Sequence, residues 1–467
     1  MPPASTIQQA SPFTARDRLF LGVLLAAGFA VGVRGIYHYG YIGQDFAFWL
    51  KMIRAFPSVP WSILRAQTTP PTLFWFGSLM RTHVAPTHFL EAIALVFLAA
   101  NAAGLWVFYG LLWECIANWQ LRYSAAAFAT FVPFRVIHSI VIAADAFTFP
   151  LFALVALFTV RLVKNPASLA SWVGLSLCLS AGMLCKYFFS GLLPAAVLVL
   201  AMAIAVRLPR GERLRWSVVG FLALAVPTGV FLIEMGESSR AKGTVTDLVW
   251  LRKGEPAVMR WRDVLLLKGS DLDLLSAPGY FRDKIYAVRK YSYPGLLHVS
   301  AVTDVMDLFQ PPPARIPTDW GHRVQEPFVR ERSALSQRLQ TWSVRGCVVF
   351  SALALAGTLF FGVRCGLALV RRAPLVTDSA AVLLALALGF YSPVFFALTL
   401  LNDPYEAGYW LPRLVLPALV VFFSLGFAAL DFLYQSLARW RGAPRAFLNV
   451  FAGYTLVACL LFVGFLT

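Results

Sequence analysis

The sequence predicts an all-α membrane protein with about 11 transmembrane helices, and two observations carry that prediction. First, 59% of its 467 residues are hydrophobic and only 13% are charged, with a mean hydropathy of +0.69, whereas soluble domains carry about 25% charged residues. Second, apolar runs long enough to cross roughly 30 Å of hydrocarbon recur from end to end. These runs lie at about residues 18–36, 89–111, 123–143, 146–163, 168–185, 188–206, 216–235, 342–363, 376–400, 410–433 and 447–466.

The spans divide the chain into four expected parts. The first span lacks a small-residue cleavage pattern and ends near Arg34, so we expect an uncleaved anchor. The parts are an inner disordered tail at 1–17, an N-terminal transmembrane catalytic module at 18–236 that includes an outer loop at 37–88, an extracytoplasmic subdomain at 237–340, and a C-terminal transmembrane module at 341–467.

Lys and Arg residues in the short loops predict the orientation. With the N-terminus inside, the short-loop cations fall on the inner side, as the positive-inside rule requires. They are Arg16, Arg18, Arg122, Arg161, Lys164, Arg207, Arg210, Arg213, Arg215, Arg364, Arg371, Arg372, Arg439, Arg441 and Arg445. The net charge of +17 is therefore mostly a topology signal and does not indicate a nucleic-acid partner.

The first outer loop predicts two helices that lie along the membrane surface. At 100° per residue, four apolar side chains share one face and two cations share the opposite one. The two sets are Phe46, Trp49, Ile53 and Phe56, against Lys51 and Arg54. Pro70 and Pro71 end the first helix and precede a second apolar stretch at 73–80. Such a loop forms a ledge on which a lipid head group and a polar acceptor can meet.

The outer segment between the seventh and eighth spans is far longer than an ordinary loop. It carries 16 of the 40 basic and 12 of the 23 acidic residues, and long outer segments translocate regardless of charge. Its apolar clusters predict a partly ordered unit against the membrane, broken at QPPPARIP. The six cysteines lie in or beside spans, so no disulfide framework is indicated.

Two acids fall at the outer ends of spans. Asp45 starts the first outer loop, and Asp145 lies in the very short loop between the third and fourth spans, at the expected outer mouth of the bundle. A charge at that depth is costly unless it is paired or wetted, which favours a functional role. The alternative for each acid is a helix N-cap, because a helix follows directly.

Two cations on the outer side are poorly explained by topology. Lys186 follows the fifth span and opposes the inside-positive bias, which favours a phosphate ligand, although a snorkelling lysine is the alternative. Arg413 lies one turn inside the tenth span and needs an anionic partner. A structural pair with Asp403 or Glu406 is the alternative to a ligand.

The six histidines are scattered and give no metal-site spacing. Amphipathic placement at the membrane interface is the expected reason for most of them, His298 included. One histidine together with Asp45 is the only arrangement that suggests a divalent ion. No cofactor is therefore expected, and a divalent cation has no support beyond that arrangement.

The order of five motifs along this topology resembles the GT-C superfamily of polytopic glycosyltransferases, the group that contains protein O-mannosyltransferases and lipid A aminoarabinose transferases. The motifs are YIGQDFAFW, TTPPTLFWF, AADAFTFPLF, GMLCKYFFSGLLPA and GYWLPRLVLP. The resemblance covers roughly residues 15–235 and 340–435.

The resemblance implies a sugar donor on a polyprenyl phosphate, used at the outer face of a bacterial inner membrane or the lumenal face of an equivalent one. By motif position, Asp45 would be the general base and Asp145 a second carboxylate, while Lys186 and Arg413 would bind the donor phosphate. Family members often have two adjacent acids in the first loop, where this chain has Gln44 before its single acid. Residues expected near the acceptor or in secondary roles are Gln44, Tyr405, Glu406 and Tyr409.

These residue types suit the chemistry on their own terms. A carboxylate can accept the proton of an acceptor hydroxyl, and fixed cations stabilise the charge on a leaving phosphate. Two cations favour a monophosphate donor over a diphosphate. The expected partners are thus a polyprenyl-phosphate sugar, membrane lipids, and an acceptor that is a lipid, a glycan or a protein.

Two other function classes remain open. A lipid-linked saccharide flippase would need polar residues threading several spans at mid-depth, whereas these polar groups gather at the outer rim. An O-antigen polymerase or ligase also has many spans and a large outer loop, but its chemistry is expected in that large loop. Comparing the loss of activity after changing Asp45 with that after changing Arg282, Arg289 or Arg332 would separate it from a GT-C enzyme.

Overall fold

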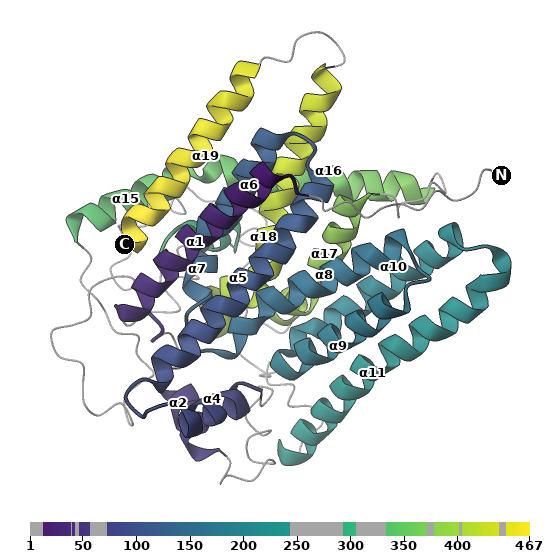
Figure 1. Ribbon diagram of the computed structural model, residues 1–467, viewed down its shortest axis with the longest axis horizontal. Coiled ribbons are helices and arrows are strands. Elements are labelled where there is room, and N and C mark those ends of the chain that lie inside the picture. The colour runs from purple at the N-terminus through teal and green to yellow at the C-terminus, as the bar shows by residue number, and fades with distance from the viewer. Residues whose placement is uncertain are drawn as a thin grey trace.

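The computed structural model describes residues 13–38, 40–42, 46–56, 72–242, 293–304, 333–370, 378–400, 404–438 and 445–467. These ranges contain helices and no strand (Figure 1). The helices are α1 (Ala15–Tyr37), α2 (Phe46–Ala55), α4 (Thr72–His83), α5 (Phe89–Cys115), α6 (Trp119–Phe131), α7 (Pro133–His138), α8 (Thr148–Lys164), α9 (Leu169–Cys185), α10 (Leu192–Arg207), α11 (Arg210–Lys242), α14 (Tyr293–Val302), α15 (Ala334–Gly346), α16 (Val348–Val370), α17 (Ser379–Leu400), α18 (Pro404–Ala438) and α19 (Arg445–Leu466), with 3-10 turns η1 (Ala144–Phe147) and η2 (Tyr187–Gly191).

The prediction of an all-α protein that crosses a membrane several times is confirmed. Within the described ranges, eight helical segments are long and apolar enough to cross a membrane, and two further apolar helices are shorter, at Leu169–Cys185 and Ser379–Pro393. Helices α8 to α11 pack side by side at the right of Figure 1, while α1, α5, α6 and α19 form a second group. Contacts between α5 and α8 join the two groups.

The third expected span, 123–143, is interrupted. Helix α6 ends at Phe131, and a six-residue helix, α7, begins at Pro133. Proline has no backbone N–H, so it cannot continue the hydrogen-bond ladder of the preceding helix. The buried guanidinium of Arg135 donates to the carbonyl of Thr130, one of the acceptors that the break leaves open. The break lets residues 139–143 run irregularly through the interior to η1.

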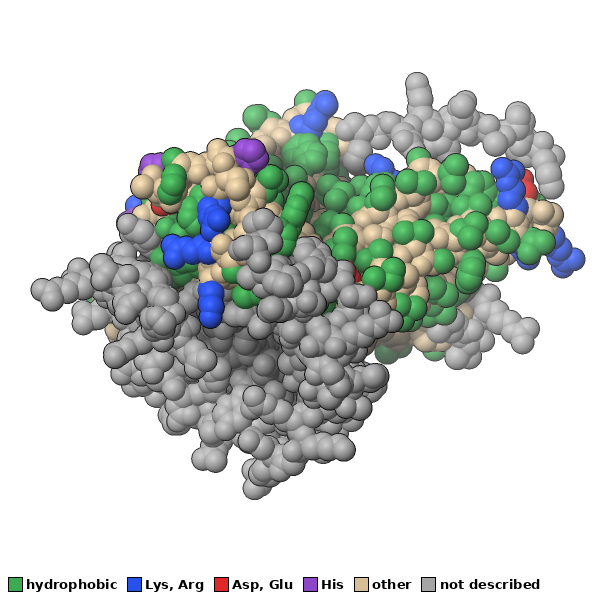
Figure 2. Space-filling view, turned by 90° about the horizontal axis from the view of Figure 1, so that it is seen from below, with side chains coloured by type: hydrophobic (Ala, Val, Ile, Leu, Met, Phe, Trp, Pro, Cys, Tyr) green, Lys and Arg blue, Asp and Glu red, His purple; other side chains and the backbone are tan. Residues whose placement is uncertain are grey.

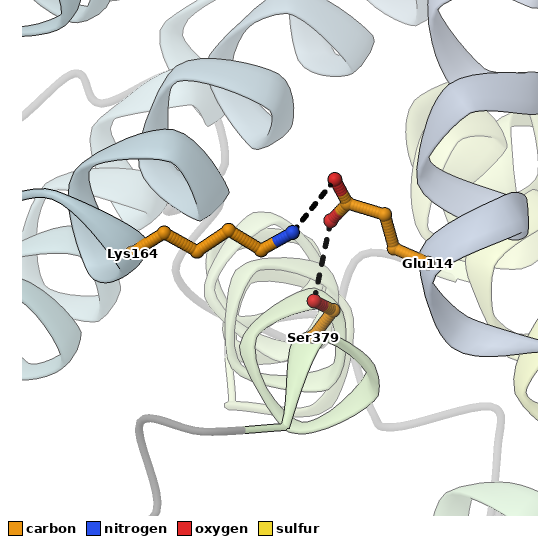
Figure 3. Close-up of polar contacts among 3 residues, drawn as sticks. All are labelled: Glu114, Lys164 and Ser379. Carbon is orange, nitrogen blue, oxygen red and sulfur yellow. Dashed lines mark hydrogen bonds and ion pairs between the residues drawn. The ribbon is translucent and has the colours of Figure 1, made fainter. Parts of the chain in front are cut away.

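Polar contacts join helix ends that the predicted topology places on the same side. Glu114 at the end of α5 contacts Lys164 at the end of α8 (2.9 Å) and accepts from Ser379 at the start of α17 (3.3 Å), as Figure 3 shows. Near these residues in the topology, the Asp431 carboxylate of α18 accepts from the backbone N–H groups of Ala117 and Asn118. We call this side the Glu114 end.

The other ends of the same helices also meet one another. Arg34 at the end of α1 donates to the carbonyl of Thr467 just after α19. Thr72 at the start of α4 donates to the carbonyl of Leu184 near the end of α9. Because η1 lies on this side too, we call it the Asp145 end. Consecutive membrane-spanning helices therefore run in opposite directions, as the predicted topology requires.

Glycines allow two pairs of helices to touch through their backbones. A Cβ built on Gly357 of α16 would lie 2.5 Å from the Leu425 carbonyl of α18, and one on Gly426 would lie 2.7 Å from the Leu353 carbonyl carbon. Gly191 and Gly389 bring η2 against α17 in the same way. Small residues at helix crossings are a common means of tight packing in membranes, where no hydrophobic effect drives helices together.

Part of the expected outer subdomain lies inside the bundle. Helix α14 contacts α7, α15 and α18, and its residue His298 is buried. The imidazole Nε2 lies 2.8 Å from the Val344 carbonyl, which can only accept, so Nε2 donates, and Nδ1 forms a 2.8 Å hydrogen bond with the Ser351 hydroxyl. The interfacial placement expected for His298 is wrong, because both ring nitrogens have partners in the protein interior.

Candidate functional site

Two of the predicted site residues form a buried ion pair. Lys186 Nζ lies 2.8 Å from Asp145 Oδ1, and their side chains are 13% and 2% exposed. Burying two charges is costly unless they face each other with good geometry, and removing one partner leaves the other uncompensated. The pair therefore places a cation and a carboxylate at a fixed spacing where α8 begins and α9 ends.

The side chain of Asn101 in α5 hydrogen-bonds to the backbone of η1, the turn that contains Asp145. Its amide nitrogen donates to the carbonyls of Ala146 (2.8 Å) and Phe97 (2.9 Å), and the side chain is fully buried. The hydroxyl of Thr148 donates to the carbonyl of Asp145 itself at 2.7 Å. Side chains of α5 and α8 thus hold the two adjacent backbone carbonyls of Asp145 and Ala146 in η1.

Lys186 follows α9 in an extended conformation, with φ −157° and ψ 128°. Its backbone N–H closes the last turn of α9 on the carbonyl of Gly182 (2.7 Å), after which η2 turns the chain back. Gly182 is needed here because a Cβ at that position would overlap the ring of Phe189. The ammonium group also lies 5.6 Å from the ring centre of Phe188.

The structure excludes a helix cap for Asp145 and a snorkelling side chain for Lys186. Phe147 is the N-cap of α8 and Ala143 that of η1, so Asp145 stands inside η1 and occupies neither cap position. Lys186 does not reach for water as a snorkelling lysine would, because its ammonium group pairs with a buried carboxylate. The sequence predicted Asp145 at the outer mouth of the helix bundle. In the structure it is buried, with 1% of its surface exposed.

The pair lies about one hydrocarbon thickness from the Glu114 end. Helices α8 and α9 each contain 17 residues, and a helix of that length measures about 25 Å. The hydrocarbon core is roughly 30 Å thick. A membrane that covers α8 and α9 therefore brings the pair close to its boundary with water.

The first outer loop contacts the segments that lead into both members of the pair. The amide of Ile142 donates to the carbonyl of Tyr41 at 3.0 Å, which ties the start of this loop to the segment leading into Asp145. The Thr72 hydroxyl ties its second helix to the carbonyl of Leu184, two residues before Lys186. Segments far apart in the sequence thus converge around one ion pair.

Helices α2 and α4 pack against each other and then against the site. Trp49 faces Phe74 with ring centres 5.7 Å apart, and a Cβ on Gly77 would lie 2.6 Å from Ile53. On its other side, α4 places Phe76 against Phe97 and Phe147, the second of which follows Ala146 in η1. The apolar face expected on α2 is present, and it contacts α4.

Two residues near the site were missed by sequence reasoning. Asn101 had a visible signal, since it is a polar residue in the middle of an apolar span. Glu91, in the first turn of α5, has one carboxylate oxygen 3.5 Å from the hydroxyl of Tyr41 and a second oxygen that is buried without a hydrogen-bond partner among the described residues. Its position at the outer end of a span is the same kind of signal that singled out Asp145.

The remaining predicted site residues lie outside the described residues in whole or in part. Asp45 and Gln44 fall between Ile42 and Phe46, both of which are buried. The backbone of the α18 segment is described, but the side chains of four predicted residues are not: Tyr405, Glu406, Tyr409 and Arg413. Within the described ranges, no group of three or more His, Cys, Asp or Glu side chains could hold a metal ion.

No family model matches the chain, and no curated protein matches it. Among solved structures, the apo oligosaccharyltransferase of Archaeoglobus fulgidus aligns at 14% identity and a TM-score of 0.47, covering 97% of this chain and 57% of that one. The complex of AglB from the same organism with an inhibitory peptide and a dolichol-phosphate aligns at 14% identity and a TM-score of 0.46, covering 97% of this chain and 56% of that one. ArnT from Cupriavidus metallidurans bound to undecaprenyl phosphate aligns at 15% identity and a TM-score of 0.36, covering 89% of this chain and 77% of that one. The chain thus spans little more than half the length of the two archaeal structures.

Proposed function

We propose that the chain is a membrane glycosyltransferase that moves a sugar from a polyprenyl-phosphate carrier to an acceptor hydroxyl. The observation that carries the proposal is the buried Asp145–Lys186 pair, next to which Tyr41 and Thr72 of the first outer loop make hydrogen bonds. The resemblance of five ordered motifs to GT-C enzymes supports it.

In the proposed reaction, the acceptor oxygen attacks the anomeric carbon while the bond from that carbon to the phosphate oxygen breaks. Asp45 accepts the hydroxyl proton as general base. The polyprenyl monophosphate leaves with the bonding electron pair, and Lys186 and Arg413 stabilise its charge. Asp145 orients Lys186 so that the ammonium group stands at a fixed position before the donor arrives.

The proposed location is the outer side of a bacterial inner membrane, with the Asp145 end facing the periplasm. The cations of the short connections support this orientation, since most of them belong to the Glu114 end. A pair near the hydrocarbon boundary suits a donor whose isoprenoid tail stays in lipid and whose sugar phosphate reaches water.

The decisive experiment is a transfer assay with the purified full chain in lipid nanodiscs. The protein is incubated with a panel of radiolabelled polyprenyl-phosphate sugars and candidate acceptor hydroxyl compounds, and products are separated from donor. We expect transfer from at least one donor, and loss of transfer in Asp45→Asn and in Lys186→Gln. Donor movement across sealed liposomes without any glycosyl product would instead indicate a flippase and would overturn the proposal.

A further inference from the structure

Arg345 of α15 departs from the usual placement of charge on the helices of this protein. On the face drawn in Figure 2, hydrophobic side chains cover most of the right-hand part, and Lys and Arg lie mainly toward its end, where α10 and α11 meet. A surface in contact with lipid has this pattern, because a charge costs least at the boundary with water. Arg345 is exposed although it lies in the interior of the apolar span Ala334–Ala368.

Two contacts with α19 fix the depth of Arg345. The Tyr454 hydroxyl donates to the carbonyl of Gly346, the next residue, and a Cβ on Gly464 would lie 3.3 Å from Leu339. Helix α15 therefore runs from near the end of α19 toward its middle, and the two helices lie together at the left of Figure 1. Tyr454 is about 14 Å from the start of α19 and about 18 Å from its end. Because α19 is itself long and apolar enough to cross the membrane, Arg345 lies near the middle of the hydrocarbon.

Arg345 takes no part in an ion pair within the residues that the structure describes. The described acids are either buried or within about a turn of a helix end, so none of them is placed to meet a cation on this outward face. Snorkelling does not solve the problem, because it carries a charge to the water boundary only from near a helix end. The guanidinium therefore needs an anion from outside the protein.

Arg345 belongs to a face of α15 that is not used for packing. At 100° per residue it falls within about 80° of three other exposed residues, Leu335, Arg338 and Trp342. Leu335 and Trp342 are 65% and 58% exposed. The opposite face of α15 is bonded to α14, because the Ser343 hydroxyl donates to a backbone carbonyl of that helix at 2.5 Å. The outward face is thus free to contact another molecule.

The depth of Arg345 selects the kind of partner. Phospholipid phosphates lie outside the hydrocarbon and do not reach its middle. A second copy of this chain presents no exposed acid at that depth among its described residues. An acid on a membrane-spanning helix does reach it, and charged residues at such depths pair with one another. We propose that the outward face of α15 docks a membrane-spanning helix of another protein, and that an Asp or Glu side chain of that helix pairs with Arg345.

The residues around Arg345 suit such a helix. Trp342 lies one turn away on the same face and provides a large apolar contact area. Arg338 lies next to Leu339, near the end of α19, so its charge is close to water and does not need the same partner. The docking surface takes no part in the proposed transfer reaction, so either proposal can fail without the other.

The docking surface is tested with a synthetic helix as the probe. A Lys-flanked polyleucine peptide carries one central Glu and a photoreactive leucine beside it. The peptide is inserted with the full chain into phosphatidylcholine nanodiscs, and crosslinks to residues 334–370 are quantified by mass spectrometry. A peptide with Gln in place of the Glu is the matched probe. We expect roughly three- to tenfold more crosslinking by the Glu peptide, the size of polar contacts between membrane helices.

Variants of the chain identify the cause of that preference. Arg345→Gln should remove the preference for the Glu peptide, and Arg345→Lys should keep it. Arg338→Gln removes the other exposed cation of the same face and should keep it too. Because Arg345→Gln removes a charge that has no partner in the protein, its thermal unfolding midpoint should be unchanged or higher, which also serves as the control for folding.

Five results would overturn the proposal. Equal crosslinking by the two peptides, or an undiminished preference in Arg345→Gln, would show that no acid pairs with Arg345. A clearly lower unfolding midpoint in Arg345→Gln would show that its partner is already within the chain. Loss of the preference when phosphatidylglycerol is added would assign Arg345 to a lipid phosphate, and self-association that Arg345→Gln abolishes would assign it to a second copy of the chain.

Discussion

The amide of Ile142 donates a 3.0 Å hydrogen bond to the carbonyl of Tyr41, and this bond joins the two segments that lead into Asp145 and Asp45. Each acid follows its bonded residue by three or four positions. The contact ties the described start of the first outer loop to the segment that leads into Asp145.

The first prediction concerns the buried ion pair. Asp145→Asn or Lys186→Gln leaves a buried charge without its partner, so each should lower the free energy of unfolding by about 3 kcal/mol. The double variant should lose less free energy of unfolding than the two single variants lose together, because it leaves neither charge of the pair behind. Thermal unfolding in a fixed detergent measures all three.

A more exposed ion pair provides the comparison for these variants of the buried pair. Glu114 and Lys164 also form an ion pair, but the Lys164 side chain is 52% exposed. Lys164→Gln should change stability by no more than about 1 kcal/mol. A loss as large as that of Lys186→Gln would show that burial is not what distinguishes the two pairs.

The second prediction assigns Asn101 a positioning role. Asn101→Leu removes the donor to the Ala146 carbonyl and should cost about 1 kcal/mol of stability, the usual size for such bonds between helices in membranes. Because η1 would then hold Asp145 less firmly, kcat should fall while KM changes little. Steady-state kinetics with an active donor measure both.

Thr159 supplies the matched control for Asn101. It is fully buried in α8, and its hydroxyl donates only within its own helix, to the carbonyl of Val155. Thr159→Val should therefore leave kcat unchanged whatever it does to stability. Equal losses of kcat in both variants would reduce Asn101 to a general packing role.

The third prediction concerns the general base. Asp45→Asn should lower the transfer rate by roughly 10²- to 10⁴-fold, the range for loss of a general base. Donor binding should persist, since Lys186 and Arg413 are unchanged. Equilibrium binding of a radiolabelled donor and single-turnover transfer separate the two effects, and retained turnover would remove Asp45 from this role.

The fourth prediction concerns the crossing of α16 and α18. Gly357→Ala places a methyl group 2.5 Å from the Leu425 carbonyl, so the helices must separate, which should cost about 1–3 kcal/mol. Gly362→Ala on the same helix meets nothing within 4 Å and should have little effect. Thermal unfolding compares the two, and equal midpoints would contradict the close crossing.

Sequence reasoning predicted the helical class and most span positions. Hydropathy over about 20 residues decides whether a segment can cross a membrane, and that property is local. Most of the expected spans correspond to described helices, whereas the third is broken at Pro133 and the eighth, 342–363, begins in α15 and continues in α16. Pro133 is visible in the sequence, but the hydropathy of an apolar segment is the same whether or not its helix is interrupted.

The candidate site was only partly predictable. Asp145 and Lys186 stood out because charges are scarce at span ends, yet nothing in their spacing showed that they pair. Asn101 and Glu91 act on the site through the backbone and hydroxyl of residues distant in the sequence. Such contacts depend on which helices are neighbours, a property that no single segment carries.

The amino-acid sequence by itself determined that this chain is helical, that it crosses a membrane repeatedly, and which ends of its helices share a side, because hydrocarbon thickness and loop charge act on each segment separately. Tertiary structure alone decided that Asp145 meets Lys186, that the first outer loop docks beside them, and that His298 lies inside the bundle. These relationships arise where helices cross, and the small residues and buried polar groups at each crossing select one arrangement among many of equal hydropathy.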